Sequence, residues 1–140
     1  MLYTASRMAK QKLKSNNNVV FSCQYHVVFC PKYRRKVLNE PIAARLKTIV
    51  LELAQEFGQE ALEMEVRLDH VHLLCAVDPQ FGIAKWVRVV KGRSSRLLRQ
   101  EFPELKRRLP TLWTNSYLVV TCGGAPLSVI KQYIENQKGK

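Results

Sequence analysis

The chain has 140 residues, of which 46% are hydrophobic and 24% charged, the balance of a single globular domain with its own core. No apolar run approaches the roughly 18 residues that span a bilayer, and no secretory hydrophobic segment opens the chain, so we expect a cytoplasmic protein without a membrane partner. Lys and Arg number 23 against 11 Asp and Glu, and the net charge of +12 favours a polyanionic partner.

The charge is unevenly distributed along the chain. Residues 1–40 carry a net charge of +7 and residues 81–140 a net charge of +9, whereas residues 41–80 carry −4. Two basic blocks around an acidic segment favour nucleic acid, the commonest polyanionic partner. An acidic membrane surface is the alternative, but no basic amphipathic helix with a bulky exposed apolar edge supports it.

The N-terminal part predicts an arm followed by a strand. Residues 1–18 are polar and basic and end in three asparagines, which indicates a flexible arm outside the core. Residues 19–30 are rich in β-branched and aromatic residues, with apolar side chains on the odd-numbered positions from Phe21 to Phe29. They predict a strand that Pro31 ends.

The middle of the chain predicts a helix and a β-hairpin. Apolar residues recur with helical spacing between Asn39, a suitable N-cap, and Gly58, where the helix ends. Residues 61–68 and 70–77 are two candidate strands with Asp69 near the turn between them, so together they predict a hairpin.

The C-terminal part predicts a helix, a strand and a last helix. Residues 83–102 form an amphipathic helix, and residues 103–110 form a polar connection with a proline at each end. Residues 112–122 predict a strand, and a last helix begins at Pro126. The four cysteines lie far apart in apolar segments without a C-x-x-C pair, so we expect buried, reduced thiols. They are Cys23, Cys30, Cys75 and Cys122.

The order β-α-β-β-α-β with an added C-terminal helix predicts an α+β fold of the ferredoxin-like, RRM-like type. In that fold an antiparallel sheet carries its helices on one face, and we expect the other face to be free for function. We predict one domain at residues 19–140. Within it, residues 125–140 form a mobile helix, because Gly123, Gly124 and Pro126 offer a hinge before it.

His70 and His72 are the sharpest chemical feature, because residues i and i+2 of a strand point to the same face. Two imidazoles can bind a divalent cation, provided that a third ligand is supplied. The opposite parity is apolar, so we expect the histidine face to be polar and accessible. Cys75 has that opposite parity and is rejected as a ligand. The alternative is a pair of surface histidines without a ligand.

Tyr133 and Gln137 lie four residues apart in the last predicted helix and so share one helix face. A tyrosine hydroxyl can attack a phosphodiester, and a Gln carbonyl oxygen can bind a hard cation such as Mg²⁺ or Mn²⁺. The alternative is a half-buried packing tyrosine and a solvated glutamine.

A basic surface is predicted on the helix at residues 83–102 and on the loop at residues 32–36. On the helix, Lys85, Arg88, Arg96 and Arg99 lie opposite the apolar stripe, and Gly92 falls among them. Gly92 would allow close approach of a sugar-phosphate backbone, or else it marks a bend. The candidate nucleic-acid-binding residues are Lys32, Tyr33, Arg34, Arg35, Lys36, Lys85, Arg88, Lys91, Gly92, Arg93, Arg96 and Arg99.

Taken together, these segments resemble one family. They are the strand ending in CPKYRRKV, the DHVHLL motif, the helix VVKGRSSRLLR, the segment LWTNSYLVVT, and Tyr133 with Gln137. The chain from residue 19 to residue 137 resembles the single-tyrosine transposases of insertion sequences that move as single-stranded DNA, members of the His-hydrophobic-His (HUH) endonuclease superfamily.

The resemblance implies that His70, His72 and Gln137 bind Mg²⁺ or Mn²⁺ and that Tyr133 is the nucleophile. It implies cleavage of single-stranded ends at subterminal hairpins through a 5′-phosphotyrosine, with no nucleotide cofactor. It further implies a prokaryotic homodimer, nucleoid-associated when bound to DNA, in which the tyrosine helix is donated to the partner's histidine pair. The sequence itself leaves open whether that helix acts within its own subunit.

Three alternatives remain beside this interpretation. A histidine-triad nucleotide hydrolase needs a third histidine where this chain has Leu74. A non-catalytic single-stranded nucleic-acid-binding protein of ferredoxin-like fold explains charge and fold, although the parity of His70 carries no aromatic residue for base stacking. A replication-initiator-type HUH nickase or relaxase is usually a longer chain.

Overall fold

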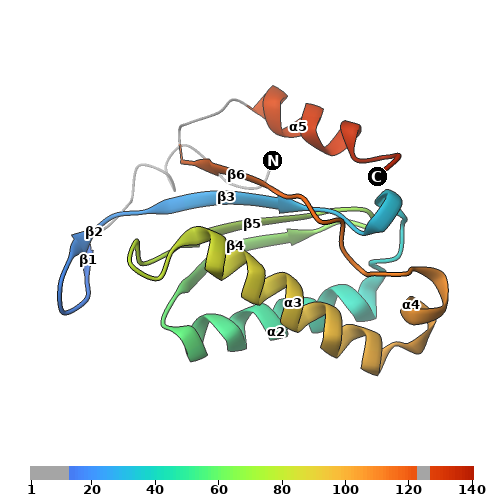
Figure 1. The fold of residues 1–140 in the computed structure, drawn as a ribbon, viewed down its shortest axis with the longest axis horizontal. Helices are drawn as coiled ribbons and strands as arrows, with labels where there is room; N and C mark the ends of the chain where they lie inside the picture. The colour runs from blue at the N-terminus through green and yellow to red at the C-terminus, as the bar shows by residue number, and fades with distance from the viewer. Residues whose placement is uncertain (1–12, 123–126) are drawn as a thin grey trace.

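The computed structural model describes residues 13–122 and 127–140, which form an antiparallel sheet between helices (Figure 1). The sheet has the strand order β4-β5-β3-β6, so β5 lies between two strands that run in the same direction. Its strands are β3 (Gln24–Phe29), β4 (Glu60–Val66), β5 (Val71–Ala76) and β6 (Leu118–Thr121). The helices are α2 (Glu40–Phe57), α3 (Ile83–Glu101), α4 (Pro103–Arg108) and α5 (Leu127–Asn136), with a 3₁₀ turn, η1, at Lys32–Arg34. This arrangement is the predicted ferredoxin-like α+β fold.

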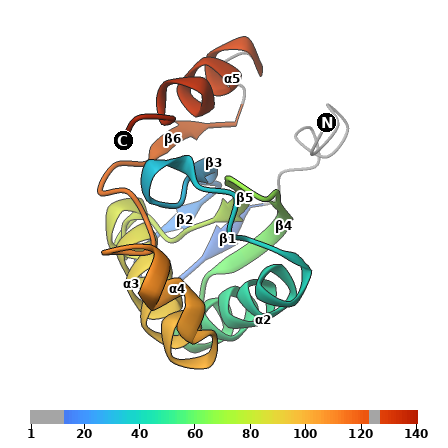
Figure 2. The same cartoon turned by 90° about the vertical axis from the view of Figure 1, so that its right-hand side faces the viewer.

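Two layers of helix enclose the sheet. Helices α2 and α3 cover one face, and α5 lies across the other (Figures 1 and 2). The odd-numbered residues of β5 from Val71 to Cys75 pack with the apolar stripe of α2 and with Trp86 and Leu98 of α3. The prediction of a free second face is therefore wrong, because α5 occupies part of it. None of these helices is long and apolar enough to cross a membrane, as far as the described residues extend.

The ends of α2 are set by local chemistry that the sequence predicted. The side chain of Asn39 accepts a hydrogen bond from the backbone N–H of Ile42, which satisfies a donor of the first turn. Gly58 ends the helix in the left-handed conformation with a φ of 70°, which a residue with a Cβ adopts only at a cost. The two caps therefore set the ends of α2, and its buried apolar residues pack against the sheet.

Three segments differ from their predictions. The connection at residues 103–110 contains the short helix α4, which begins at a proline in its first turn. The segment 112–122 is not one continuous strand: Trp113 forms a single antiparallel bridge with Pro31, and β6 begins only at Leu118. The end of the N-terminal arm is structured: β1 (Lys14–Ser15) pairs with β2 (Val20–Phe21), a strand separate from β3.

The structure describes only part of the predicted N-terminal arm and none of the predicted hinge. Asn16 donates a hydrogen bond to the carboxylate of Asp78 at 2.7 Å, so the tip of the arm is tied to the loop after β5. Residues 1–12 and the predicted hinge at residues 123–126 lie outside the described residues.

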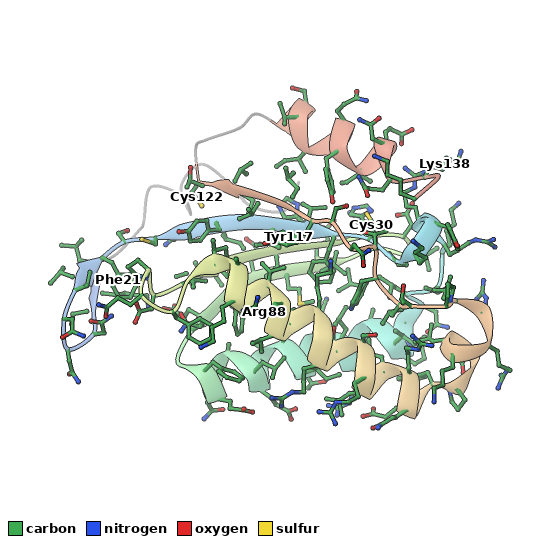
Figure 3. All side chains as sticks on the ribbon, viewed as in Figure 1. Phe21, Cys30, Arg88, Tyr117, Cys122 and Lys138 are labelled. Atoms are coloured by element: carbon green, nitrogen blue, oxygen red, sulfur yellow. The ribbon has the colours of Figure 1, made fainter. Side chains whose placement is uncertain are left out.

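The cysteine prediction is confirmed for two of the four thiols. Cys75 is buried in β5, whereas Cys23 and Cys122 are partly exposed. Cys30, which is labelled in Figure 3, is buried just after β3. Burial raises the pKa of Cys30 and of Cys75 to about 12, so both stay protonated thiols. Cys75 also packs in the core on the helix side of the sheet, which confirms its rejection as a ligand.

Candidate active site

His72 lies at the centre of the sheet, opposite Val28 of β3 and Glu65 of β4. It is only 4% exposed, and Leu74, two residues further on the same face, is fully buried. The prediction of an accessible histidine face is therefore wrong at His72. Burial, followed by the neighbouring imidazoles of His26 and His70, lowers the pKa of His72 to about 3. The ring is therefore neutral at physiological pH.

His26 is a third histidine of this face that the sequence analysis missed. Its Nδ1 lies 3.3 Å from Nε2 of His72, and the two rings lie 5.5 Å apart between centroids. Burial lowers the pKa of His26 as well. The signal was present in the strand, because His26 stands on the even-numbered parity, away from the apolar positions. The pairing of β3 with β5 is what turns that parity toward His72.

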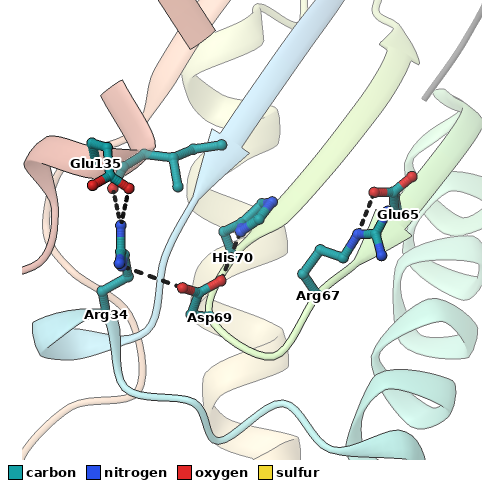
Figure 4. A network of polar contacts seen from close by, with 7 residues as sticks. Arg34, Glu65, Arg67, Asp69, His70 and Glu135 are labelled. Carbon is teal, nitrogen blue, oxygen red and sulfur yellow. Dashed lines mark hydrogen bonds and ion pairs between the residues drawn. The ribbon is translucent and has the colours of Figure 1, made fainter. Parts of the chain in front are cut away.

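His70 lies just before β5, where its ring contacts Asp69, and Asp69 in turn contacts Arg34 (Figure 4). Its Nδ1 lies 2.8 Å from Oδ1 of Asp69, and Nε of Arg34 lies 3.2 Å from Oδ2 of the same carboxylate. The second distance is that of an ion pair rather than of an aligned hydrogen bond. Arg34 also donates to the Ile134 carbonyl at 3.2 Å and pairs with Glu135 at 3.1 Å.

Tyr133 and Gln137 meet at one serine of the segment before β6. The hydroxyl oxygens of Tyr133 and Ser116 lie 3.4 Å apart, and Ser116 donates to the carbonyl oxygen of Gln137 at 3.4 Å. Gln137 is only 3% exposed, so it is not the solvated surface residue of the alternative interpretation. Burial raises the pKa of the partly buried Tyr133. Gln137 follows the end of α5 at Asn136, so the two residues do not both lie in the helix as predicted, yet both contact Ser116, which was missed.

The two histidines, His70 and His72, would need a third ligand such as a side-chain amide to bind a divalent cation. No three His, Cys, Asp or Glu side chains converge on one point within residues 13–122 and 127–140. A cation site built from acidic or thiolate residues is therefore absent from this part of the chain. Imidazole nitrogens, as in His70 and His72, and an amide carbonyl oxygen, as in Gln137, are donor types that Mg²⁺ and Mn²⁺ accept.

A cavity of about 440 Å³ lies between α3 and the segment 111–117. Arg88 and Gly92 line it on the helix side, and Trp113, Asn115 and Tyr117 line it on the other. A Cβ at Gly92 would meet no atom within 4 Å, and α3 continues through this residue, so the alternative interpretation of Gly92 as a bend is wrong. Gly92 instead leaves space open on the basic side of the helix.

Some of the predicted basic residues of α3 are exposed, and the others bond to groups of the same chain. Lys85, Arg88 and Arg96 are exposed, with Lys85 lying over the ring of Phe81. The others bond within the chain. Arg93 lies 3.7 Å from a carboxylate oxygen of Glu56, and Arg99 donates to the carbonyl of Pro110 at 3.1 Å.

Lys91 of α3 holds the segment that carries Ser116. Its ammonium donates to the carbonyls of Thr114, Asn115 and Ser116 at 2.6, 3.3 and 3.1 Å. Burial lowers its pKa to about 8, which the three carbonyl contacts oppose by favouring the charged form. Lys91 thus binds the backbone of residues 114–116, the segment in which Ser116 contacts Tyr133.

The predicted basic loop at residues 32–36 presents an aromatic ring between cations. Tyr33 is 41% exposed, and Lys32 and Arg35 lie 5.2 and 6.0 Å from its ring centroid. Lys36 is exposed as well. Tyr33 and Arg34 both have a positive φ, 61° and 51°, and this backbone turns Arg34 inward, where its side chain is 13% exposed.

Known proteins that resemble this chain share one description. The family model "Transposase IS200 like" matches residues 19–137. The ISDra2 transposase TnpA of Deinococcus radiodurans is 37% identical over 131 residues, 92% of this chain and 94% of that protein. The transposase for insertion sequence element IS200 of Salmonella typhimurium is 32% identical over 126 residues, 89% of this chain and 82% of that protein. A crystal structure assigned as a D. radiodurans R1 transposase has a TM-score of 0.80 at 36% identity, covering 91% of this chain and 99% of that one.

Proposed function

Because the chain belongs to the IS200-like transposase family, whose members cleave and join DNA strands, we propose that it cleaves and rejoins single-stranded insertion-sequence ends at subterminal hairpins. One observation carries this proposal, the double contact of Arg34. Its guanidinium pairs with Asp69, the neighbour of His70. It also binds the carbonyl of Ile134, the neighbour of Tyr133. One arginine therefore contacts the residue before His70 and the residue after Tyr133.

Tyr133 is the proposed nucleophile. Its phenolic oxygen attacks the scissile phosphorus, the bond from phosphorus to the 3′ oxygen breaks, and the 5′ phosphate remains on Tyr133. The phenolic proton leaves Tyr133, and the departing 3′ oxygen gains a proton to become a hydroxyl. A 3′-hydroxyl of another strand later attacks the phosphotyrosine and releases Tyr133, so no nucleotide cofactor is consumed. Ser116, 3.4 Å from the Tyr133 hydroxyl, orients that oxygen.

His70, His72 and Gln137 are the proposed holders of a Mg²⁺ or Mn²⁺ ion. A cation at these residues supplies positive charge against the charge that develops on the phosphate. The neutral state of buried His72 supports this assignment, because a protonated imidazole cannot be a ligand. Gln137, buried and bonded through Ser116 next to Tyr133, would place its carbonyl oxygen on the nucleophile's side.

The cavity beside α3 is the proposed entry of the single strand. It is lined by Arg88 and Gly92 on α3 and by Asn115 and Tyr117 on the facing segment. Ser116 lies between those last two residues and touches Tyr133, so a strand bound in the cavity is adjacent to the nucleophile. The exposed Tyr33 with its two cations offers a second contact on the same chain.

We also propose a homodimer in which α5 of each copy completes the site of its partner. In the single chain, α5 lies on its own sheet, where Arg34 pairs with Glu135 and Ser116 contacts Tyr133. The α5 helix of a second copy, docked on the same face, would make these two contacts equally well. The donated helix of the family supports this trans arrangement.

The proposed function is tested with single-stranded DNA taken from both flanks of the gene. We expect a covalent protein–DNA adduct on a denaturing gel when Mg²⁺ is present, and none with a chelator or with fully duplex DNA. A non-catalytic nucleic-acid-binding protein would bind the same strand without forming an adduct. Binding without an adduct in Mg²⁺ and in Mn²⁺ would therefore contradict the proposal.

A further inference from the structure

The hydrogen bond between Asp69 and His70 determines which nitrogen of His70 remains available. A carboxylate paired with a guanidinium only accepts hydrogen bonds, so Nδ1 of His70, 2.8 Å from Oδ1 of Asp69, carries the hydrogen. In a neutral imidazole the lone pair then resides on Nε2. Asp69 thus selects the tautomer as well as the orientation of the ring.

The carboxylate of Asp69 is itself held from the other side. Arg34 approaches Oδ2 to 3.2 Å, while Oδ1 faces His70 (Figure 4). The side chains of Arg34, Asp69 and His70 are only 13%, 19% and 21% exposed. Water therefore competes little for the contacts between them. The Arg34 guanidinium also reaches α5 through the Ile134 carbonyl. One arginine therefore fixes the carboxylate behind His70 and contacts the helix that carries Tyr133.

We propose that Asp69 is a positioning residue that presents Nε2 of His70 to the cation, and that Arg34 positions Asp69. The proposal rests on the proposed function, in which His70 is a ligand. It assigns Arg34 to the inside of the site rather than to the DNA-binding surface. A carboxylate that accepts the second N–H of a ligating histidine fixes its tautomer and raises its basicity, and its loss typically costs about 10- to 100-fold in metal affinity.

The test is a titration of the full chain with Mn²⁺ alone, without DNA, in which electron paramagnetic resonance reports the free ion. We expect Asp69→Ala to raise the Mn²⁺ dissociation constant about 10- to 100-fold. Asp69→Asn should recover most of that loss, because its amide oxygen still accepts from Nδ1. Arg34→Gln should weaken binding less than Asp69→Ala.

Arg67→Gln is the matched control for Arg34→Gln. Arg67 lies in the turn that carries Asp69 but pairs with Glu65, and Arg67→Gln removes the same charge as Arg34→Gln (Figure 4). We expect it to leave the dissociation constant unchanged. An equal loss in both arginine variants would show a general charge effect and overturn the role of Arg34.

His70→Ala separates this proposal from the proposed function. If His70→Ala leaves Mn²⁺ binding intact, the ion binds elsewhere and the metal site of the proposed function fails. If His70→Ala abolishes binding while Asp69→Ala binds like the wild type, only the positioning role is overturned.

Nitrogen-15 NMR of His70 gives a second readout on the folded, metal-free chain. We expect the Nδ1–H tautomer in the wild type and in Asp69→Asn, and a mixture of tautomers in Asp69→Ala. A wild-type spectrum in Asp69→Ala would contradict the proposal.

Discussion

Two buried imidazoles lie beside each other at the centre of the sheet, and their burial links folding to pH. His26 and His72 are 5% and 4% exposed, and burial lowers the pKa of His72 from 6.5 to about 3. Below pH 6.5 the unfolded chain binds a proton that the folded chain binds only near pH 3. The free energy of unfolding contributed by this group is thus intact above pH 6.5 and falls as the pH falls through that window.

We expect His72→Leu to flatten this dependence by up to about 1.4 kcal/mol per pH unit, the contribution of one proton. Urea denaturation between about pH 7 and about pH 5 measures it, since most carboxylates are still ionised there. The same pH dependence in His72→Leu and the wild type would show that the folded chain protonates His72.

At the scale of elements, the open space beside Gly92 of α3 predicts how the size of a side chain at this position affects DNA binding. A Cβ at Gly92 meets nothing within 4 Å, so Gly92→Ala should raise the stability of the helix by about 1 kcal/mol and leave DNA affinity intact. Gly92→Leu would fill the cavity and should weaken single-stranded DNA binding about tenfold or more. Fluorescence anisotropy with a labelled strand measures both variants. Equal affinity in both would place the DNA outside this cavity.

The exposed arginines of α3 make a prediction about salt. Arg88 and Arg96 are exposed, and their joint replacement by Ala should lower the log–log salt slope of binding by about 1.4, at about 0.7 per single-strand phosphate contact. Arg45→Ala combined with Arg67→Ala removes the same charge from α2 and from the turn after β4. This control should keep the wild-type slope. If both double variants lose slope equally, α3 is not the specific contact.

The local elements were predictable because their signals lie within a few residues. The cap at Asn39, the stop at Gly58 and the apolar spacing of α2 and α3 required no tertiary knowledge, and neither did the shared parity of His70 and His72. The burial of His72 follows from its place between β3 and β4 in the sheet, which no local pattern encodes.

The other misses have the same origin. His26 joins His72 only through the pairing of β3 with β5. The inward turn of Arg34 follows from two consecutive positive φ angles, which a run of basic residues does not announce. Lys91 and Ser116 became part of the site because a segment far along the chain returns against α3.

At the scale of the whole molecule, the account predicts composite sites shared between two copies. His70→Ala protein mixed with Tyr133→Phe protein should regain cleavage if α5 acts on its partner, because each mixed dimer then holds one intact site. Random exchange of subunits should restore about a quarter of the wild-type sites. Sedimentation at the assay concentration confirms the dimer. Verified mixed dimers without activity would contradict the trans arrangement, and a monomer would contradict the dimer itself.

The most direct test of the central claim is to locate the DNA on the protein. After reaction with single-stranded DNA from the flanks of the gene and Mg²⁺, mass spectrometry of the digested adduct should find a 5′-phosphate on Tyr133. Tyr133→Phe should bind the strand as tightly as the wild type and form no adduct, whereas Tyr117→Phe, beside the cavity, should keep it. A phosphate on Tyr117 or on any other residue, or cleavage by Tyr133→Phe, would contradict the account.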